Sequence, residues 1–577
     1  MRATSSLLLL TLLVGQSLQA AEKTAADILP ASTIAYAEIT DPKALLKGIL
    51  KHPARQKLEK LDEYKQLFES RNYKQMRTLI TVLQFQLGMT WQTAVERLTA
   101  GGIYAAVDGE TNGFAVLVRA SDKENLEKIK DTLIKLNRAD AKKKGNKDPI
   151  PEKKYRGLMA YDLGQLKLAT MDRWLLLVNK NDLAKRLLDN YLDDGGKRLA
   201  SNAQFKQARQ SIKGKPTAWS YVDVVALRKA GAGNGALKGK ADDAGSEVLF
   251  GGILGTLKKS PYATSSFYFS ANELRLNLST PFDAKWIGET REYFFGKNGK
   301  GKAPAALPAK NTLMTIAAYR DLSQMWLRAS DLFDKNTNEE LAKADSTLTT
   351  LFSGRDFGED ILGAFHPDMQ IILTRQDFSK AKVVPAIKLP AGALVLRLKN
   401  PKKNTGELRR IFQSLVGFLN IAGAQEGQPQ LDLDIDKKDG VQVVSATYVL
   451  EEGEDKKKAR INFNFSPSIA FVGDRVVLAS TKALAEELAT AKAPKSPPNK
   501  VVNVETVTYF KAIKDILNDN RGQLIAQTML SDGKNRKEAA QQIDLIFAAI
   551  NMFRDASFQL FTTKKSLEAE IKVRLAD

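Results

Sequence analysis

Residues 98–136, LTAGGIYAAVDGETNGFAVLVRASDKENLEKIKDTLIKL, contain the pattern that predicts the fold of this chain. Residues 103–107 and 114–118 are short apolar runs that are rich in β-forming residues. Asp108-Gly109 and Asn112-Gly113 lie between the two runs, and such pairs tolerate the left-handed backbone that tight hairpins need. The stretch therefore predicts a β-hairpin.

A helix is predicted directly after this hairpin. Ser121 and Glu124 have the spacing of a capping box, in which each side chain bonds free N–H groups at a helix start. Apolar residues then recur at helical spacing and predict one apolar stripe, formed by Leu126, Ile129, Leu133 and Leu136. A hairpin that leads into an amphipathic helix is a packing unit, so it predicts a core and no ligand site of its own.

The rest of the chain repeats this unit with variations. Residues 166–178 predict another hairpin, which is followed by a leucine-striped helix. In residues 274–279 three leucines alternate with Arg275, Asn277 and Ser279. That alternation predicts a strand with one buried face and one solvated face.

The repeats also suggest an internal duplication. Leu29-Pro30-Ala31 recurs as Leu307-Pro308-Ala309, and Asp321 follows the second copy much as Asp41 follows the first. Further matches fall in the same order along the chain, which chance rarely arranges. The chain length and the long period argue against a short-repeat solenoid.

We therefore predict an α+β protein of two homologous halves in tandem, each an antiparallel-rich sheet of hairpins with amphipathic helices packed on it. A chain of 577 residues is also longer than one core usually organises. The predicted division is a signal peptide at residues 1–20, a first half at 21–295, a linker at 296–306 and a second half at 307–577. Residues 55–98 are predicted to form a charged helical insertion in the first half.

The opening of the chain resembles that of a family of uncharacterised exported bacterial proteins. The resemblance rests on the Leu29-Pro30-Ala31 opening, a strand that contains Tyr36, the Asp41-Pro42 helix start and the glycines Gly101-Gly102. Ser32 departs from the aspartate that usually closes that opening. The resemblance implies an envelope location and no assigned activity, so it supplies no functional residues.

Residues 1–20 have the pattern of a secretory signal, with Arg2 at the start, an apolar core at 7–14 and Leu18-Gln19-Ala20 as a cleavage site. We expect cleavage near Ala20, a periplasmic or secreted protein, and no transmembrane segment afterwards. The alternative is an uncleaved anchor, although the apolar run is short for a membrane span.

The formal charge of +21 favours acidic partners, and the candidates are an anionic envelope polymer, a lipid surface or a protein. The alternative is that the charge serves solubility alone. We expect no specific nucleic acid partner. The candidate contacts to an anionic surface lie in two predicted basic loops and are Lys142, Lys143, Lys144, Lys153, Lys154, Lys456, Lys457 and Lys458.

Catalytic and cofactor motifs are poorly represented. The chain has no cysteine and two histidines, His52 and His366, each followed by proline, which disfavours zinc sites and cysteine nucleophiles. Residues 296–302 (GKNGKGK) approach a phosphate loop but have Ala303 where the magnesium-binding hydroxyl belongs. We predict no cofactor and no catalytic residue.

Two other patterns each have two interpretations. Asp432, Asp434 and Asp436 resemble the start of a calcium loop, but Lys437 stands where the turn glycine belongs, so an acidic edge strand is the alternative. Trp219 and Tyr221 alternate along a strand, which is typical of core packing and also fits a sugar-stacking face.

The sequence thus predicts a non-enzymatic binding or scaffold protein of the bacterial envelope. The alternative is a carboxylate-based hydrolase that acts on envelope glycan, for which a cleft with two buried carboxylates is the expected signature.

Overall fold

A computed structural model describes residues 22–53, 55, 59, 68–143, 150–193, 195–231, 241, 243–352, 354–450, 452–453, 455–494 and 501–576. The predicted signal segment lies outside these residues, as does Lys144. Within them, no helix combines the length and apolar composition that crossing a bilayer requires.

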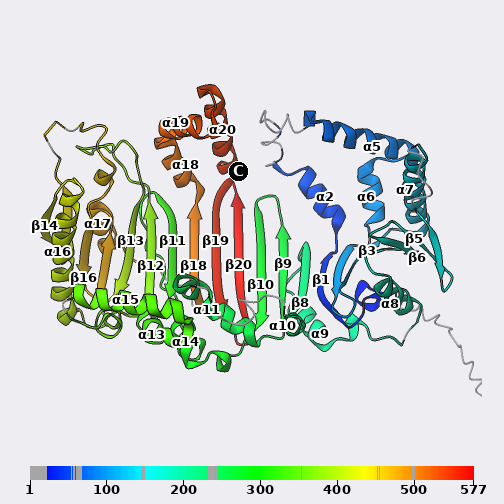
Figure 1. Cartoon of the computed structure of the whole chain (residues 1–577), viewed down its shortest axis with the longest axis horizontal. Coiled ribbons are helices and arrows are strands. Elements are labelled where there is room, and N and C mark those ends of the chain that lie inside the picture. The colour runs from blue at the N-terminus through cyan, green and yellow to red at the C-terminus, as the bar shows by residue number, and fades with distance from the viewer. Residues whose placement is uncertain are drawn as a thin grey trace, which may run out of the picture.

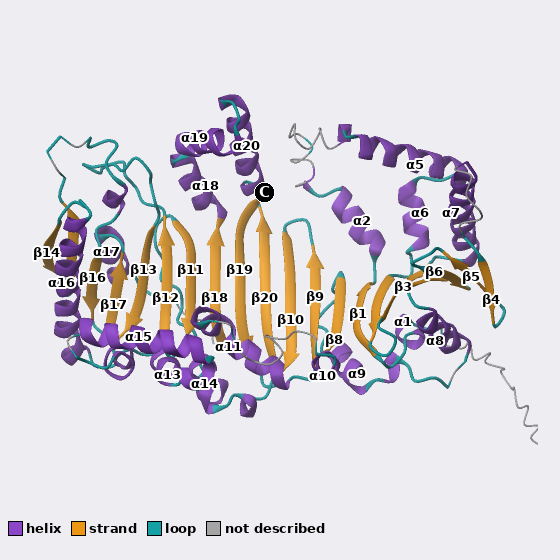
Figure 2. Cartoon of the chain, in the orientation of Figure 1, coloured by secondary structure: helices purple, strands orange, loops and turns teal. Residues whose placement is uncertain are grey.

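The described residues form one continuous antiparallel sheet with helices packed on both of its faces (Figure 1, Figure 2), which confirms the predicted α+β class. The strands are β1 Thr33–Ile39, β2 Ile103–Asp108, β3 Gly113–Arg119, β4 Glu152–Tyr155, β5 Leu158–Asp162, β6 Lys167–Met171, β7 Trp174–Val178, β8 Ala218–Asp223, β9 Tyr262–Phe269, β10 Glu273–Pro281, β11 Thr312–Tyr319, β12 Asp368–Thr374, β13 Ala391–Arg397, β14 Leu431–Lys438, β15 Val441–Tyr448, β16 Ser468–Val472, β17 Arg475–Ala479, β18 Val501–Tyr509, β19 Phe553–Thr562 and β20 Ser566–Leu575.

The helices lie mostly along the two long edges of the sheet (Figure 2). They are α1 Ala25–Ile28, α2 Pro42–Leu50, α5 Arg71–Leu87, α6 Trp91–Leu98, α7 Lys123–Lys143, α8 Asn181–Leu192, α9 Ala203–Gln210, α10 Val224–Lys229, α11 Ala244–Lys259, α12 Glu292–Phe295, α13 Leu322–Leu327, α14 Ala329–Leu332, α15 Lys335–Leu351, α16 Pro401–Gln425, α17 Lys482–Thr490, α18 Phe510–Asp519, α19 Arg521–Asp532 and α20 Arg536–Ile550.

Both halves of the sheet have the same strand order. Strand pairing runs β4-β5-β6-β7-β3-β2-β1-β8-β9-β10 in the first half. It runs β14-β15-β16-β17-β13-β12-β11-β18-β19-β20 in the second half. The first strand of each half also carries a register shift at its start, between Thr33 and Ala35 in β1 and between Thr312 and Met314 in β11. The correspondence agrees with the predicted repeat, whereas common descent of the halves stays a prediction.

The halves join through their last strands. β10 pairs antiparallel with β20 from Glu273 opposite Arg574 to Pro281 opposite Ser566, with Asn277 opposite Glu570 at the middle. Each half therefore contributes the same strand to the seam, as in an isologous contact between twofold-related subunits. Residues on one face of the first half continue onto the same face of the second.

Each half has its main core on one face, which we call the back face. In the first half α8 and α9 pack there against Leu117, Trp219 and Tyr221. In the second half α17 packs there against Val443, Ala470 and Val477. Trp219 and Tyr221 are 2% and 0% exposed, so they are core residues and form no sugar-stacking surface.

The structure corrects two details of the predicted helix after β3. α7 begins at Lys123 and not at Asp122, because Asp122 accepts a hydrogen bond from the backbone N–H of Asn125 (2.7 Å) and so caps the helix itself. The hydroxyl of Ser121 instead donates a hydrogen bond to the Asp122 carboxylate. The predicted stripe holds at Leu126 and Ile129, but Leu133 is 47% exposed because the helix turns Ile134 inward.

Other predicted segments are placed as follows. The helical insertion contains α5 and α6 in its described part, whereas residues 56–58 and 60–67 lie outside the description. The predicted linker is closely packed, since Gly301 lies against the Phe295 carbonyl and Ala303 donates to the Val502 carbonyl. The first predicted basic loop is wrong in part, because its ends are the last turn of α7 and strand β4.

Candidate functional site

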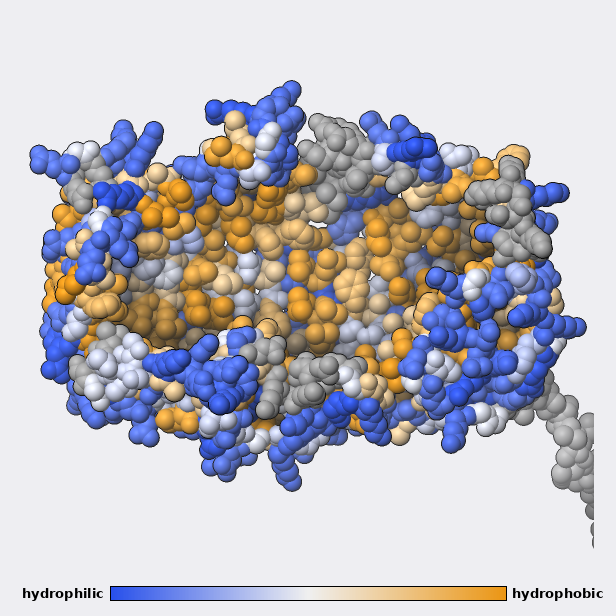
Figure 3. All heavy atoms as spheres, in the orientation of Figure 1, coloured by the Kyte–Doolittle hydropathy of each residue, from blue (hydrophilic) through white to orange (hydrophobic). Residues whose placement is uncertain are grey.

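The face of the sheet opposite the back face carries the feature best suited to binding. We call it the open face and define it by Leu274, Leu276 and Leu278 of β10 and the residues that pair with them across the sheet. Figure 3 shows that the apolar side chains on this side gather in a hollow, with hydrophilic side chains above and below it. The hollow crosses the seam between the two halves.

One row of paired residues on the open face can be followed across the sheet. It contains no charged residue, and its members in order are Ile103, Ile39, Ala218, Phe267, Leu276, Ile571, Phe558, Thr506, Ile316, Ile371, Leu394 and Leu478. Every member is half-buried and none is fully buried. Their back-face neighbours include Tyr36 at 3%, Ala317 at 0% and Ile372 at 0% exposed. Burial therefore alternates on β1, β11 and β12, where the back face is covered. On β10 and β20 at the seam it does not alternate, since the back-face residues Arg275, Asn277 and Glu570 are half-buried as well.

This arrangement contradicts the prediction for residues 274–279. The three leucines were expected to be buried, but Leu278 is 40% exposed and the other two are half-buried. Leu278 lies between the small residues Ser265 and Ala569 on the neighbouring strands, which leave its side chain uncovered. Arg275, Asn277 and Ser279 on the other face of β10 are half-buried as well, so neither face of residues 274–279 is the fully buried one that the alternation predicted.

A helix covers the open face at each of its two ends. At the far end of the second half, α16 covers it with Phe412 and Val416, which pack on strands β14 to β17. At the far end of the first half, Ile134 of α7 packs against Tyr161 of β5. The uncovered floor therefore lies between α7 and α16.

One long side of the floor is bounded by α11 to α14. Phe294 and Phe295 are almost fully buried there in a cluster that includes Leu560 and Leu567 from the ends of β19 and β20. Arg320 anchors this wall, because its guanidinium lies 3.5 Å from the Phe294 ring centroid and donates to the Val248 carbonyl and to Asn503 Oδ1. Burial lowers the pKa of Arg320 to about 9.

The other long side is approached by α2. A Cβ atom on Gly48 would lie 2.7 Å from Cε1 of Phe269, so only glycine lets the helix come this near to the open face. The imidazole of His52 lies next to the same ring, with centroids 5.4 Å apart. His52 thus packs at the wall of the hollow, in agreement with a structural role.

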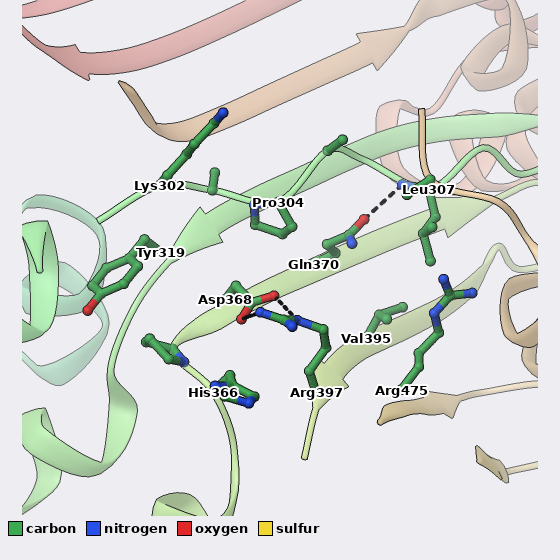
Figure 4. A pocket seen from close by; sticks show the side chains of 14 residues that line it. Lys302, Pro304, Leu307, Tyr319, His366, Asp368, Gln370, Val395, Arg397 and Arg475 are labelled. Atoms are coloured by element: carbon green, nitrogen blue, oxygen red, sulfur yellow. Dashed lines mark hydrogen bonds and ion pairs between the residues drawn. The ribbon is translucent and has the colours of Figure 1, made fainter. Parts of the chain in front are cut away.

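The back face carries a separate cavity of about 560 Å³ beside the segment that connects the halves (Figure 4). Its charged groups are engaged within the protein. Arg397 forms a two-bond ion pair with Asp368 (2.6 and 2.7 Å), and Arg475 donates to the carbonyls of Leu488 and Ala491 at the end of α17. His366 also lines the cavity, and its backbone N–H donates to the Arg397 carbonyl (2.8 Å). The charged side chains that line this cavity therefore bond mainly to other groups of the protein.

The buried carboxylates of the described residues each bond to partners within the protein. Four carboxylate side chains in the described part of the chain are buried, namely Glu38, Asp108, Glu247 and Asp555. Each has its own partner: Arg209 for Glu38, Ser32 and Thr111 for Asp108, Arg291 and Tyr293 for Glu247, and Arg574 for Asp555. Glu38 and Arg209 together line a second cavity of about 340 Å³ beside Phe205.

The predicted basic contacts are not brought together. Lys142 is exposed in the last turn of α7, and Lys153 and Lys154 are exposed on β4, which is one edge strand of the sheet. Lys456, Lys457 and Lys458 are exposed in the segment after β15, where the Lys456 carbonyl accepts a hydrogen bond from the backbone N–H of Val384. Lys143 belongs to α7, but its side chain lies outside the description.

The remaining candidate motifs have structural roles. β14, which contains Asp432, Asp434 and Asp436, is an edge strand, and Lys482 of α17 pairs with the last two of these carboxylates. The phosphate-loop-like residues 296–302 contain a single 3-10 turn, Lys297–Gly299, and lead into no α-helix of their own. In the described part of the chain, no cluster of three or more histidine, aspartate or glutamate residues could hold a metal ion.

The fold and the hollow define an α+β protein with a wide open-faced sheet and a largely uncharged floor. No family model matches the chain, and no curated protein matches it. Among solved structures, crystal form III of TP0453 is similar at a TM-score of 0.24 and 10% identity over 45% of this chain and 80% of that chain. Crystal form I of TP0453 gives the same score and identity over 45% and 79%. Likeness at this level carries no conclusion about function.

Proposed function

We propose that this chain is a non-enzymatic, exported envelope protein that binds the acyl chains of a lipid along the open face. The observation that carries the proposal is the uncharged row on the open face, which runs from Ile103 to Leu478. Phe558 and Leu478 pack against the clusters that flank the floor, and the ten other members of the row belong to no hydrophobic core cluster of the described residues.

Contact between an uncovered apolar floor and water is unfavourable in free energy. Each square ångström of apolar surface removed from water is worth about 25 cal/mol, so a ligand that covers the floor gains stabilisation without requiring hydrogen bonds. The row offers one hydroxyl, on Thr506, and no charge, which suits hydrocarbon better than a glycan or a peptide. Large exposed apolar patches on soluble proteins commonly mark such binding surfaces.

The location and the duplication belong to the same proposal. The signal-like residues 1–20 support export, which would bring the open face into contact with envelope lipids. The matching strand orders support descent of the halves from one duplicated unit, whose last strands pair to widen the floor. The engaged state of the buried carboxylates gives no support to a glycan hydrolase.

The proposal is tested by lipid binding to a matched pair of variants. Leu278→Glu places a charge on the open face, and Ser557→Glu places one on the back face of a nearby strand, opposite Lys572. The purified proteins are extracted with organic solvent, the lipid that they retain is quantified by mass spectrometry, and binding of the neutral apolar probe N-phenyl-1-naphthylamine is measured by fluorescence.

We expect the parent protein and Ser557→Glu to retain lipid and to bind the probe, and Leu278→Glu to lose most of both. Equal lipid and probe binding by the two variants would contradict the proposal. Absence of both from the parent protein, together with a dimer in sedimentation velocity that Leu278→Glu dissociates, would show that a second copy covers the face instead.

A further inference from the structure

Helix α5 carries an unusual set of exposed side chains. Phe85 is 89% exposed, Leu79 65%, Met76 47% and Val82 40%. These residues lie on one 17-residue helix, whose length is about 25 Å. The same helix contacts α6 and α7 through other residues, including the buried Leu87.

The charges of α5 are all of one sign. Its sequence, RNYKQMRTLITVLQFQL, contains Arg71, Lys74 and Arg77 and no aspartate or glutamate. The three basic residues are exposed. A helix that combines large exposed apolar residues with basic residues and no acid has the composition of helices that lie in the interfacial layer of a membrane.

The second half provides an internal comparison. α15 follows β11 as α5 follows β1, and it also has 17 residues. Its described side chains include no exposed large apolar residue, and its charges are Lys335, Lys343, Glu339, Glu340 and Asp345. The two helices lie on opposite long edges of the molecule (Figure 1), so the corresponding helix of the second half does not share the composition of α5.

A second exposed apolar side chain lies on the same edge. α19 extends from that edge in the other half of the molecule (Figure 1) and carries Leu530, which is 87% exposed. Two apolar points far apart along one edge fit a flat, extended partner better than a groove on a globular protein. The net charge of +21 makes an anionic partner electrostatically favourable.

We infer that the α5 edge docks on a bilayer surface that carries anionic lipid headgroups, with Phe85 and Leu79 inserted among the headgroups. Interfacial helices place their apolar residues roughly 5–10 Å into this layer. The docking surface is separate from the open face, so it does not rest on the lipid-binding function proposed above.

The test is co-sedimentation of the purified protein with vesicles of phosphatidylcholine and phosphatidylglycerol in equal parts, and with vesicles of phosphatidylcholine alone. One variant is Leu79→Gln with Phe85→Gln, and a second is Lys74→Gln with Arg77→Gln. The matched control is Lys335→Gln with Lys343→Gln on α15. All six side chains are exposed, so the variants should fold as the parent does.

We expect the parent to bind the anionic vesicles and the apolar variant to bind them roughly tenfold more weakly or worse. The basic variant should also bind more weakly and show a smaller salt dependence, whereas the α15 control should bind as the parent does. Leu278→Glu should keep vesicle binding, which separates this inference from the proposed function.

Several outcomes would overturn the inference. They are failure of the parent to bind anionic vesicles, equal binding by the parent and the apolar variant, and equal binding of the parent to neutral and anionic vesicles. If the parent self-associates but does not bind vesicles, and only the apolar variant loses this self-association, the α5 edge would be assigned to contact with a second copy of the chain.

Discussion

The open face can be tested by comparing two leucines on opposite faces of the same sheet. Leu117 of β3 faces the back and is 0% exposed, whereas Leu278 of β10 faces the open side and is 40% exposed. Replacement of either by alanine removes the same three carbon groups. The difference in cost therefore reports how well each face is covered.

The magnitudes follow from burial. Three carbon groups at ~0.8 kcal/mol each give roughly 2.4 kcal/mol for complete burial. Leu278 is about 60% covered, which lowers its share to about 1.4 kcal/mol, and its removal leaves no enclosed cavity. Leu117→Ala adds a cavity in a packed core, so its cost should be about 2–5 kcal/mol.

The assay is urea unfolding of delipidated protein, followed by circular dichroism, with the shift in transition midpoint compared between the two variants. Leu278→Ala should shift the midpoint clearly less than Leu117→Ala. If both leucines cost the same in delipidated protein, the open face is covered in solution and the reasoning fails.

Four further predictions concern stability and processing. Asp41→Ala and Asp321→Ala each remove a helix N-cap and should each lower the free energy of unfolding in urea by about 1 kcal/mol. An unchanged free energy of unfolding in either variant would contradict the equivalent capping of α2 and α13. Glu247→Ala removes the fully buried partner of Arg291, whose side chain is 14% exposed, and should cost about 3 kcal/mol, read as a lowered melting temperature. An unchanged melting temperature would refute the role of this ion pair. Hydrogen bonds from the backbone N–H of Asn125 and the hydroxyl of Ser121 lower the pKa of Asp122 from 3.8 to about 2. The stabilisation by the Asp122 carboxylate is therefore fully present above pH 3.8 and is lost as the pH falls through 2. In Asp122→Asn the free energy of unfolding should depend less on pH across this range. Intact-mass measurement of the exported protein should place the new N-terminus near Ala21 or Glu22, and a mass that retains residues 1–20 would exclude cleavage.

Local elements were predictable where a short-range signal determines them. Asp41-Pro42 marks the start of α2, and the hairpin of residues 166–178 appears as β6 and β7, because caps and turns depend on a few adjacent residues. The cap of α7 was assigned one residue early, since Ser121 and Asp122 can both accept from a helix start and only the backbone geometry selects between them.

The candidate site was not predictable to the same degree. The alternation in residues 274–279 separates the two faces of β10, but neither face is fully buried in the structure, since coverage depends on helices that are distant in sequence. The continuous row on the open face depends on twelve strands in register, and the β10–β20 pairing joins residues almost 300 positions apart. The exposed residues of α5 were likewise hidden within a segment whose charge suggested an ordinary solvated helix.

The central claim, that an apolar ligand covers the open face, is best tested by thiol labelling, because the chain has no cysteine of its own. Leu278→Cys introduces a single thiol on the open face, and Ser557→Cys introduces one on the back face as the control. The rate of reaction with a maleimide is measured on delipidated protein and again after addition of a lysophospholipid. The account predicts rapid labelling of residue 278 without lipid, strong protection with lipid, and no effect of lipid at residue 557. Slow labelling of residue 278 without lipid, or a rate that lipid does not change, would contradict it.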